Sequence, residues 1–274
     1  MKRAGVIGWP VAHSLSPVLH GYWLNAYCIE GSYRKIAATP EDFAAAIARL
    51  RDEGFTGVNV TVPHKEAAFA LAGRKDASAV AAGAANLLVF GAGGIEARNT
   101  DVYGLSASLA GQADIAGKPV ILLGAGGAAR GALLALRERG AAHIHLLNRS
   151  LEKARALADD LNLPSVTVGA LADWAAVAPQ AKLVVNATSA GMGGNPPLDL
   201  DLSLLPQDAA VCDIVYHPLE TRLLKDAKAR GLLTIDGLGM LMHQAVPSFE
   251  AFFGLRPEVT PGLRAHLVAA LHDR

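Results

Sequence analysis

Short runs of apolar residues alternate along this chain with longer stretches that are rich in alanine. The runs Pro-Val-Ile-Leu-Leu at 119–123 and Leu-Val-Val-Asn at 183–186 have the length and composition of buried strands. In one alanine-rich stretch, Phe43, Ile47 and Leu50 recur at the spacing of a single helix face. Strands that alternate with helices predict an α/β protein in which a parallel sheet is flanked by helices.

The same pattern predicts nine strands. They are expected at Arg3–Ile7, Tyr33–Ala37, Gly57–Val62, Asn86–Phe90, Pro119–Leu123, His143–Leu147, Leu183–Asn186, Ala210–Asp213 and Leu233–Ile235. The uncharged stretch 77–95 is long enough to cross a bilayer, but it contains four glycines, Ser78 and Asn86. We therefore interpret it as a helix end, a turn and a buried strand.

The pattern also predicts two domains. A short helix over 101–112 leads to Gly117 and Lys118 and then to the strand at 119–123, where a second domain begins. Residues 1–101 together with 239–274 are expected to form one α/β domain, and residues 102–238 the other, with a cleft between them.

Composition narrows the class of partner. The 274 residues are 51% hydrophobic and 18% charged, enough apolar residues for a sizeable core. Twenty-five basic residues balance twenty-five acidic ones, so no net field attracts nucleic acid or an anionic membrane, and small molecules are the expected partners. The chain contains two cysteines, Cys28 and Cys212, and its start has no signal-like apolar core, which favours the cytoplasm. No spacing among the nine histidines indicates a metal site.

A glycine-rich segment follows the strand at 119–123. It reads Gly124-Ala-Gly-Gly-Ala-Ala-Arg130, a G-x-G-x-x-A pattern that opens a helix and is followed by a further strand. In this setting Gly124 permits a tight turn, Gly126 lets the backbone approach a pyrophosphate, and Ala129 allows close packing of helix and strand. We expect a Rossmann-type dinucleotide site here, with the phosphates at the helix N-terminus. The alternative is a tight turn in an alanine-rich chain.

The residues after the second strand of this βαβ unit indicate which dinucleotide binds. An NAD site would place an acidic residue there to accept a ribose hydroxyl. The chain has Asn148, Arg149 and Ser150 instead, with Lys153 one turn later. Guanidinium and ammonium groups pair with a 2′-phosphate, so NADP is favoured over NAD. Alternatively, Arg149 lies in solvent and Asn-Arg-Ser caps a helix.

The segment Gly57-Val-Asn-Val-Thr-Val-Pro-His-Lys65 brings a lysine just past a strand and a proline. At such a position the Lys65 ammonium can protonate a developing alkoxide or, in reverse, accept a proton from a hydroxyl. Most lysines are solvated surface groups, and that interpretation stays open for Lys65 alone.

Several motifs together carry a resemblance. They are Gly8-Trp-Pro-Val-Ala-His-Ser-Leu-Ser-Pro17, Asn59-Val-Thr-Val-Pro-His-Lys65, Gly83-Ala-Ala-Asn86, Asn99-Thr-Asp101, Gly124–Arg130, Asn148-Arg-Ser150, Asn186-Ala-Thr-Ser189 and Asp236-Gly-Leu-Gly-Met-Leu-Met-His-Gln244. In these motifs, which run through nearly the whole chain in the same order, the chain resembles the shikimate dehydrogenase family. It departs at Leu87, where the family usually has threonine, and at Ala97, where a glycine is frequent.

The resemblance implies a function and a set of site residues. It implies reversible reduction of 3-dehydroshikimate to shikimate by NADPH, with a substrate-binding first domain and an NADP-binding Rossmann domain. Lys65 and Asp101 match the family's catalytic pair. Substrate ligands implied by the resemblance are Ser14, Ser16, Asn59, Thr61, Asn86, Tyr216 and Gln244, and cofactor ligands are Gly124, Ala125, Gly126, Gly127, Ala128, Ala129, Asn148, Arg149, Ser150, Lys153, Thr188, Ser189, Gly237 and Met240.

Other interpretations stay open at this stage. Ser16 and Asp101 are also typical N-cap residues of the helices that follow them. A quinate/shikimate dehydrogenase with relaxed cofactor use is an alternative, although its family members usually have serine at the position of Thr61 and often an acidic residue near that of Arg149. A catalytically silent protein that binds a metabolite is a third, which the presence of both Lys65 and Asp101 disfavours. The sequence leaves monomer or homodimer open.

Overall fold

A computed structural model of the chain describes residues 1–272. Contacts divide the chain into two compact units. Unit 1 comprises residues 1–101 together with the chain from Leu241 onward, and unit 2 comprises Val102–Met240. The second boundary lies two residues after the one expected from the sequence. None of the helices in the described residues is long and apolar enough to cross a membrane.

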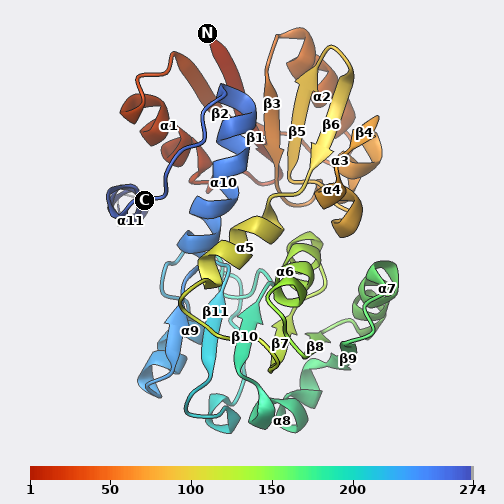
Figure 1. Cartoon of the computed structure of the whole chain (residues 1–274), viewed down its shortest axis with the longest axis vertical. Helices are drawn as coiled ribbons and strands as arrows, with labels where there is room; N and C mark the ends of the chain where they lie inside the picture. Colours follow the sequence, from red (N-terminus) through yellow and green to blue (C-terminus); the bar gives the residue numbers. More distant parts are fainter. Residues whose placement is uncertain (273–274) are drawn as a thin grey trace. The chain divides into compact units, whose positions relative to one another are not determined.

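Unit 1 is built on a six-stranded sheet (Figure 1). Its strands are β1 (Lys2–Gly8), β2 (Gly31–Ala37), β3 (Gly57–Val60), β4 (Arg74–Lys75), β5 (Leu87–Gly91) and β6 (Gly94–Arg98). Its helices are α1 (Ser16–Ala26), α2 (Phe43–Asp52), α3 (Lys65–Leu71), α4 (Ala77–Ala82) and α11 (Pro261–His272), while α5 (Asp101–Leu109) and α10 (Gly237–Phe253) belong partly to each unit.

The sheet of unit 1 is mixed, in the order β2-β1-β3-β5-β6-β4. β1 pairs in parallel with β2 and β3, but β5 runs antiparallel to both β3 and β6. The expectation of a parallel sheet is therefore wrong for this unit. The reason is the tight connection Gly91–Gly94, which joins β5 to β6 as a hairpin and leaves no room for a crossover helix.

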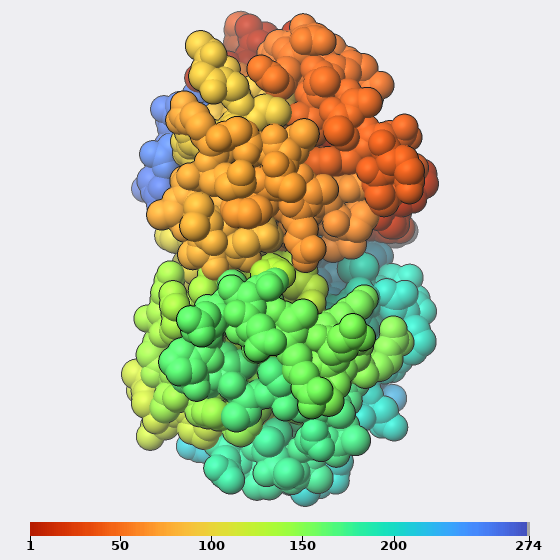
Figure 2. Space-filling model, turned by 90° about the vertical axis from the view of Figure 1, so that its right-hand side faces the viewer, coloured from red at the N-terminus to blue at the C-terminus, as the bar shows by residue number. Residues whose placement is uncertain are grey.

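Helices cover both faces of this sheet. On one face α2, α3 and α4 bury Phe43, Ile47, Ala68 and Ala79 against the strands. Residues 60–80, amber in Figure 2, form much of the surface of this side of the unit. On the other face α1 and α10 join in an aromatic cluster around His20, whose ring stacks on Tyr33 of β2 with centroids 3.9 Å apart. The remaining members are Trp23, Phe249, Phe252 and Phe253.

Unit 2 contains a second six-stranded sheet (Figure 1). Its strands are β7 (Pro119–Leu123), β8 (His143–Asn148), β9 (Val166–Ala170), β10 (Leu183–Asn186), β11 (Ala210–Asp213) and β12 (Leu233–Ile235). Its helices are α6 (Gly127–Glu138), α7 (Leu151–Leu161), α8 (Trp174–Val177) and α9 (Arg222–Ala229), with short 3₁₀ turns at Leu171–Asp173, Ala178–Gln180 and Leu202–Leu204.

All neighbouring strands of the second sheet are parallel, in the order β12-β11-β10-β7-β8-β9. Counted from β7, this is the doubly wound order of a dinucleotide-binding fold, whose direction of winding reverses between β7 and β10. The parallel sheet predicted from the alternating pattern is confirmed here. Trp174, Leu202 and Leu224 close one face of this sheet as part of its apolar core.

Each of the nine predicted strands corresponds to a strand of the structure, with ends that differ by up to two residues. Three strands were missed: β4, β6 and β9. β4 has two residues, too few for any pattern. β6 carries Glu96 and Arg98, and β9 lies at the end of its sheet with no fully buried position, so neither shows the apolar run of a buried strand.

Candidate active site

The first candidate site lies along one edge of the sheet of unit 1. β1 and β3 are parallel, so their carboxyl ends, followed by Ser14 and Thr61, lie at the same edge. Because β5 is antiparallel to β3, it begins at that edge, directly after Asn86. β6 is antiparallel to β5 and ends there, and Asp101 follows it. The hairpin therefore brings Asn86 and Asp101 to the end of β3, where Lys65 begins α3.

Lys65 and Asp101 form an ion pair. The Lys65 Nζ lies 2.5 Å from Asp101 Oδ2, and the side chains are 12% and 5% exposed. Asp101 is the first residue of α5, and its backbone N–H donates to Asn99 Oδ1 at 3.0 Å. Its carboxylate therefore faces Lys65 and the polar groups beside it.

The Asn86 amide connects this ion pair to its neighbours. Its Nδ2 donates to Asp101 Oδ1 at 2.8 Å and to Thr100 Oγ1 at 2.9 Å, and lies 3.4 Å from Gln244 Oε1. Its Oδ1 accepts the Thr100 N–H at 2.7 Å, which fixes the orientation of the amide, because only an oxygen accepts from a backbone N–H. Asn86, Asp101 and Lys65 thus form one network, which Gln244 of α10 joins.

Asn59 is held from three sides. Its Nδ2 donates to the Asn86 carbonyl at 3.1 Å and to Ser248 Oγ at 2.8 Å, and its Oδ1 accepts from the Tyr33 hydroxyl at 2.8 Å. Both amide hydrogens are therefore used within the protein, and one lone pair of Oδ1 stays available. Tyr33 and Ser248 are missing from the sequence prediction, because only the fold brings them to Asn59.

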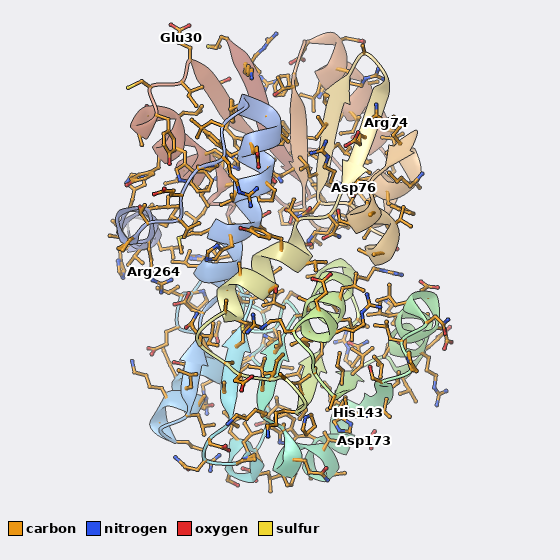
Figure 3. The ribbon with its side chains drawn as sticks, viewed as in Figure 1. Glu30, Arg74, Asp76, His143, Asp173 and Arg264 are labelled. Atoms are coloured by element: carbon orange, nitrogen blue, oxygen red, sulfur yellow. The ribbon has the colours of Figure 1, made fainter. Side chains whose placement is uncertain are left out.

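A second chain of hydrogen bonds holds the segment before Asp101. Asp76, labelled in Figure 3, is the N-cap of α4 and accepts from the Ser78 hydroxyl at 2.6 Å and the Ala79 N–H at 2.9 Å. The Ser78 hydroxyl accepts from the Asn99 N–H at 2.8 Å. The start of α4 therefore fixes Asn99, which in turn accepts the N–H of Asp101.

Ser14, Ser16 and Thr61 follow the ends of β1 and β3. Ser14 Oγ accepts the Ser16 N–H at 3.2 Å, so the two serines are adjacent in space. The N-cap of α1 is Leu15, not Ser16, which is the first residue of the helix, with Pro17 as the second. The N-cap alternative for Ser16 is therefore wrong. Gly8 packs on Thr61, since a Cβ there would lie 2.4 Å from Thr61 Cγ2.

The second candidate site is the glycine-rich turn between β7 and α6. Gly124 has a φ of 111°, which only glycine adopts readily. Gly126 caps α6, and a Cβ built on it meets nothing within 4 Å, so its backbone can be approached closely. Ala129 is fully buried on α6. These features fit the pyrophosphate of a dinucleotide at the start of α6, which lies directly after the switch-point strand β7.

Two exposed cations lie after β8. Arg149 and Lys153 are exposed, and no ion pair within the described part of the chain involves either of them. Ser150 is the N-cap of α7 and accepts the Lys153 N–H at 3.4 Å, and Asn148 Nδ2 donates to the Ser150 carbonyl. The expected helix cap is confirmed, and it leaves both cations available to an anionic group.

The Asn-Ala-Thr-Ser segment after β10 forms a hydrogen-bonded turn. Asn186 Oδ1 accepts from the Thr188 N–H at 3.0 Å and from the Thr188 hydroxyl at 2.7 Å. This turn packs against the glycine motif, because a Cβ on Gly124 would lie 3.0 Å from Ala187 backbone atoms and from Thr188 Cγ2. Ser189 follows in the same turn. Thr188 and Ser189 thus lie beside the glycine-rich turn, within unit 2.

The remaining predicted residues lie elsewhere in unit 2. Tyr216 is half-buried three residues after the end of β11. Gly237 begins α10, where a Cβ would lie 2.3 Å from the Ile214 carbonyl oxygen, so helix and loop approach closely. Met240 is buried one turn later.

Several histidines take part in packing. His64 is buried beside Lys65, stacks on Phe43 and has its Nε2 2.8 Å from the Ala38 carbonyl. His143, labelled in Figure 3, contacts Thr167 on the neighbouring strand. Burial lowers the pKa of His20 to about 3 and also lowers the pKa of His243. Among residues 1–272 no three or more His, Cys, Asp or Glu side chains gather as metal ligands would.

Comparison with known proteins bears on this arrangement. Residues 6–88 match the family model described as the shikimate dehydrogenase substrate binding domain, and residues 106–192 match that of shikimate / quinate 5-dehydrogenase. The chain belongs to the shikimate dehydrogenase family. It has the two-domain α/β fold of that family, with an N-terminal substrate-binding domain and a Rossmann-like domain.

Individual relatives agree with this assignment. A protein from Acidiphilium cryptum named shikimate dehydrogenase (NADP(+)) is 53% identical over 98% of this chain and 97% of its own length. The structure of shikimate 5-dehydrogenase from Thermus thermophilus in complex with NADP(H) and shikimate is 36% identical, with a TM-score of 0.86, and covers 100% of this chain and 99% of that one.

A relative of different specificity matches as well. Quinate dehydrogenase from Corynebacterium glutamicum in complex with NAD is 32% identical, with a TM-score of 0.89, and covers 98% of this chain and 99% of that one. The fold is therefore shared by enzymes with different substrates and cofactors, and choosing between them depends on individual residues.

Proposed function

We propose that this protein catalyses the reversible, NADPH-dependent reduction of 3-dehydroshikimate to shikimate. The observation that carries the proposal is the Lys65–Asp101 ion pair, at the edge of the sheet where Asn86, Thr61 and the two serines also lie. An ammonium beside polar groups in a family of dehydrogenases supports acid–base work at a carbonyl oxygen.

In this proposal the residues of unit 1 divide the work. Lys65 donates a proton to the carbonyl oxygen during reduction and accepts it during oxidation, and Asp101 holds the Lys65 ammonium and a substrate hydroxyl. Ser14 and Ser16 donate to the substrate carboxylate. Thr61, Asn86 and Gln244 bind ring hydroxyls. Asn59 uses both amide hydrogens within the protein, so it can only accept from a hydroxyl.

The residues of unit 2 would hold the cofactor. The start of α6 provides backbone N–H groups for the pyrophosphate, with Gly126 permitting close approach. Arg149 and Lys153 would bind the 2′-phosphate, which favours NADP over NAD. Bound NADPH supplies the hydride of the reaction. Further contacts are proposed for Gly124, Ala125, Gly127, Ala128, Ala129, Asn148, Ser150, Thr188, Ser189, Gly237 and Met240.

We further propose that the protein works in the cytoplasm on small molecules, as a monomer or a homodimer. Its two cysteines are unpaired, with Cys28 exposed and Cys212 buried. Unpaired thiols are typical of a reducing compartment.

The test is a spectroscopic assay at the absorbance band of the reduced nicotinamide. Purified protein is mixed with shikimate and NADP, and in parallel with quinate in place of shikimate and with NAD in place of NADP. We expect rapid turnover with shikimate and NADP alone. Comparable rates with quinate or NAD would instead assign the chain to the relaxed dehydrogenases, and binding without turnover would contradict catalysis altogether.

A further inference from the structure

Asp213, the last residue of β11, is a carboxylate with no exposed surface. Within the described residues no lysine, arginine or histidine forms an ion pair with it. Burial raises the pKa of this carboxyl group, and hydrogen bonds from Thr221, Val215 and Asn186 oppose the shift. A buried ionisable group without a cation calls for a physical reason, because an apolar residue would fill the same space at less cost.

Each group that faces the Asp213 carboxylate is a hydrogen-bond donor. Oδ1 accepts from Asn186 Nδ2 and from the Val215 N–H, both at 3.0 Å, and Oδ2 accepts from the Thr221 hydroxyl at 2.7 Å. The Thr221 oxygen itself accepts the Leu224 N–H, so its hydrogen points to Asp213. Three donors and no acceptor fit a carboxylate and would not fit an amide.

The contact with Asn186 connects Asp213 to the Thr188 turn. The Asn186 amide is held from two sides, because its NH₂ group donates to Asp213 Oδ1 and its oxygen accepts the Thr188 N–H. The Asn186 oxygen is then directed at the Thr188 N–H and hydroxyl, and the Thr188 oxygen accepts the Ala190 N–H at 3.0 Å. The turn lies against Gly124 of the phosphate-binding motif.

We propose that Asp213 is a positioning residue for dinucleotide binding, which acts through Asn186 to hold the Thr188 turn beside the glycine motif. This rests on the proposed function, since it presumes that NADP(H) binds at that motif. Asp213 itself, fully buried among its three donors, does not touch the cofactor.

The direct test is the dissociation constant of NADPH for Asp213→Asn, measured by nicotinamide fluorescence well below the melting temperature. The asparagine NH₂ must face one of the donors, and the charge that anchors the Asn186 NH₂ group is removed, so the Thr188 turn is held less firmly. We expect NADPH binding about tenfold weaker, a loss of about 1.4 kcal/mol. Asp208→Asn is the matched control, because Asp208 precedes the same strand but is exposed and pairs with Lys182. The affinity of this variant for NADPH should equal that of the wild type.

A thermodynamic cycle separates positioning from general stability. Asn186→Ala leaves Asp213 in place but removes the connection to Thr188, so it should weaken NADPH binding by a similar factor. In the double variant the loss should equal that of the worse single variant, because both act through one connection. A structural role alone would lower the melting temperature of Asp213→Asn without changing NADPH affinity at low temperature, which would overturn the inference.

The controls distinguish the two proposals from each other. If the wild type fails to bind NADPH, the proposed function is wrong and the inference falls with it. If the wild type binds NADPH and both variants bind it equally well, only the inference is wrong. If Asp213→Asn fails to fold, the Asn186→Ala variant alone tests the inference. Normal NADPH affinity in Asn186→Ala would exclude any role of the hydrogen bonds that connect Asp213 to the Thr188 turn.

Discussion

Asp101 of unit 1 and Asp213 of unit 2 are both buried carboxylates at or just after the carboxyl end of a strand, yet they have opposite surroundings. Asp101 forms an ion pair with Lys65, whose side chain is still 12% exposed. Asp213 has three uncharged donors and no exposed surface. A charge next to a partly exposed partner can exchange protons with a substrate, whereas an enclosed charge can only hold its neighbours in place.

The comparison thus separates two uses of a buried charge. In unit 1 the Lys65–Asp101 ion pair lies at the edge of the sheet, where we propose that it takes part in proton transfer. In unit 2 the Asp213 carboxylate has a structural role, because its hydrogen bonds hold two loops and the start of α9 at Thr221. Removing the Lys65 ammonium should therefore abolish activity. Removing a hydrogen-bond donor to Asp213 should instead lower the stability of the protein.

The largest effect is expected from breaking the ion pair. Lys65→Met removes the ammonium and keeps the length of the side chain, so turnover of shikimate should fall about thousandfold through loss of the proton donor. Shikimate binding, measured separately by calorimetry, should change little. Lys75→Met is the control, because Lys75 donates to the Ala72 carbonyl and lies outside the network. Unchanged turnover in Lys65→Met would contradict the assignment of Lys65.

His20 is a third buried ionisable group, and it differs from both carboxylates. Neither of its ring nitrogens has a hydrogen-bond partner in the described structure. Its folded pKa of about 3 lies below the 6.5 of a free histidine, so between these values the unfolded chain binds a proton that the folded chain does not. Stability should therefore fall as the pH drops below 6.5. The contribution of His20 that is lost at pH 5 is about 2 kcal/mol.

His20→Phe tests this contribution, since phenylalanine fits the aromatic cluster and cannot titrate. Urea unfolding at pH 7 and pH 5 should show a smaller loss of stability in the variant than in the wild type. His272→Gln, at the exposed end of α11, should keep the wild-type loss. An equal loss in His20→Phe would show that His20 is not the group responsible.

An effect of similar size is expected from removing one donor of Asp213. Thr221→Val keeps the shape of the side chain but deprives the carboxylate of the Thr221 hydroxyl and α9 of its N-cap. The free energy of unfolding should fall by about 2 kcal/mol. Thr221→Ser keeps both bonds and should remain within about 0.5 kcal/mol of the wild type. Equal stability of the two variants would mean that the bond to Asp213 contributes nothing.

The smallest effect is expected at the neutral hydrogen bond in unit 1. Tyr33→Phe leaves the stacking on His20 in place and removes the hydroxyl that donates to Asn59 Oδ1. Thermal unfolding should report a loss of about 1 kcal/mol. A loss several times larger would indicate that the Asn59 amide reorients and disturbs Asn86, whose carbonyl it contacts.

The local features of this molecule were predictable from its sequence. Five of the six strands of unit 2 and the glycine-rich turn follow from short-range patterns, because a buried strand and a positive φ each depend on a few neighbouring residues. The hairpin of β5 and β6 was not predicted, because β6 carries Glu96 and Arg98 and shows no apolar run. Its antiparallel direction is what brings Asp101 to Lys65.

Hydrogen-bond partners that are distant in the sequence could not be predicted, for a different reason. Nothing in the strand Ala210–Asp213 indicates that its last residue meets Asn186 and Thr221, because the register of neighbouring strands decides this. The same holds for Tyr33 and Ser248 around Asn59.

Unit 1 is discontinuous, and its polar network includes Gln244 of α10, 3.4 Å from Asn86. A ribosome makes Lys65, Asn86 and Asp101 early, then synthesises all of unit 2 before it reaches Gln244. Domains that emerge complete can fold during synthesis, so unit 2 can reach its native state while unit 1, begun first, still lacks its last segment. Unit 2 can thus mature first although it is translated second, and no nascent chain that ends before Gln244 can contain the whole network.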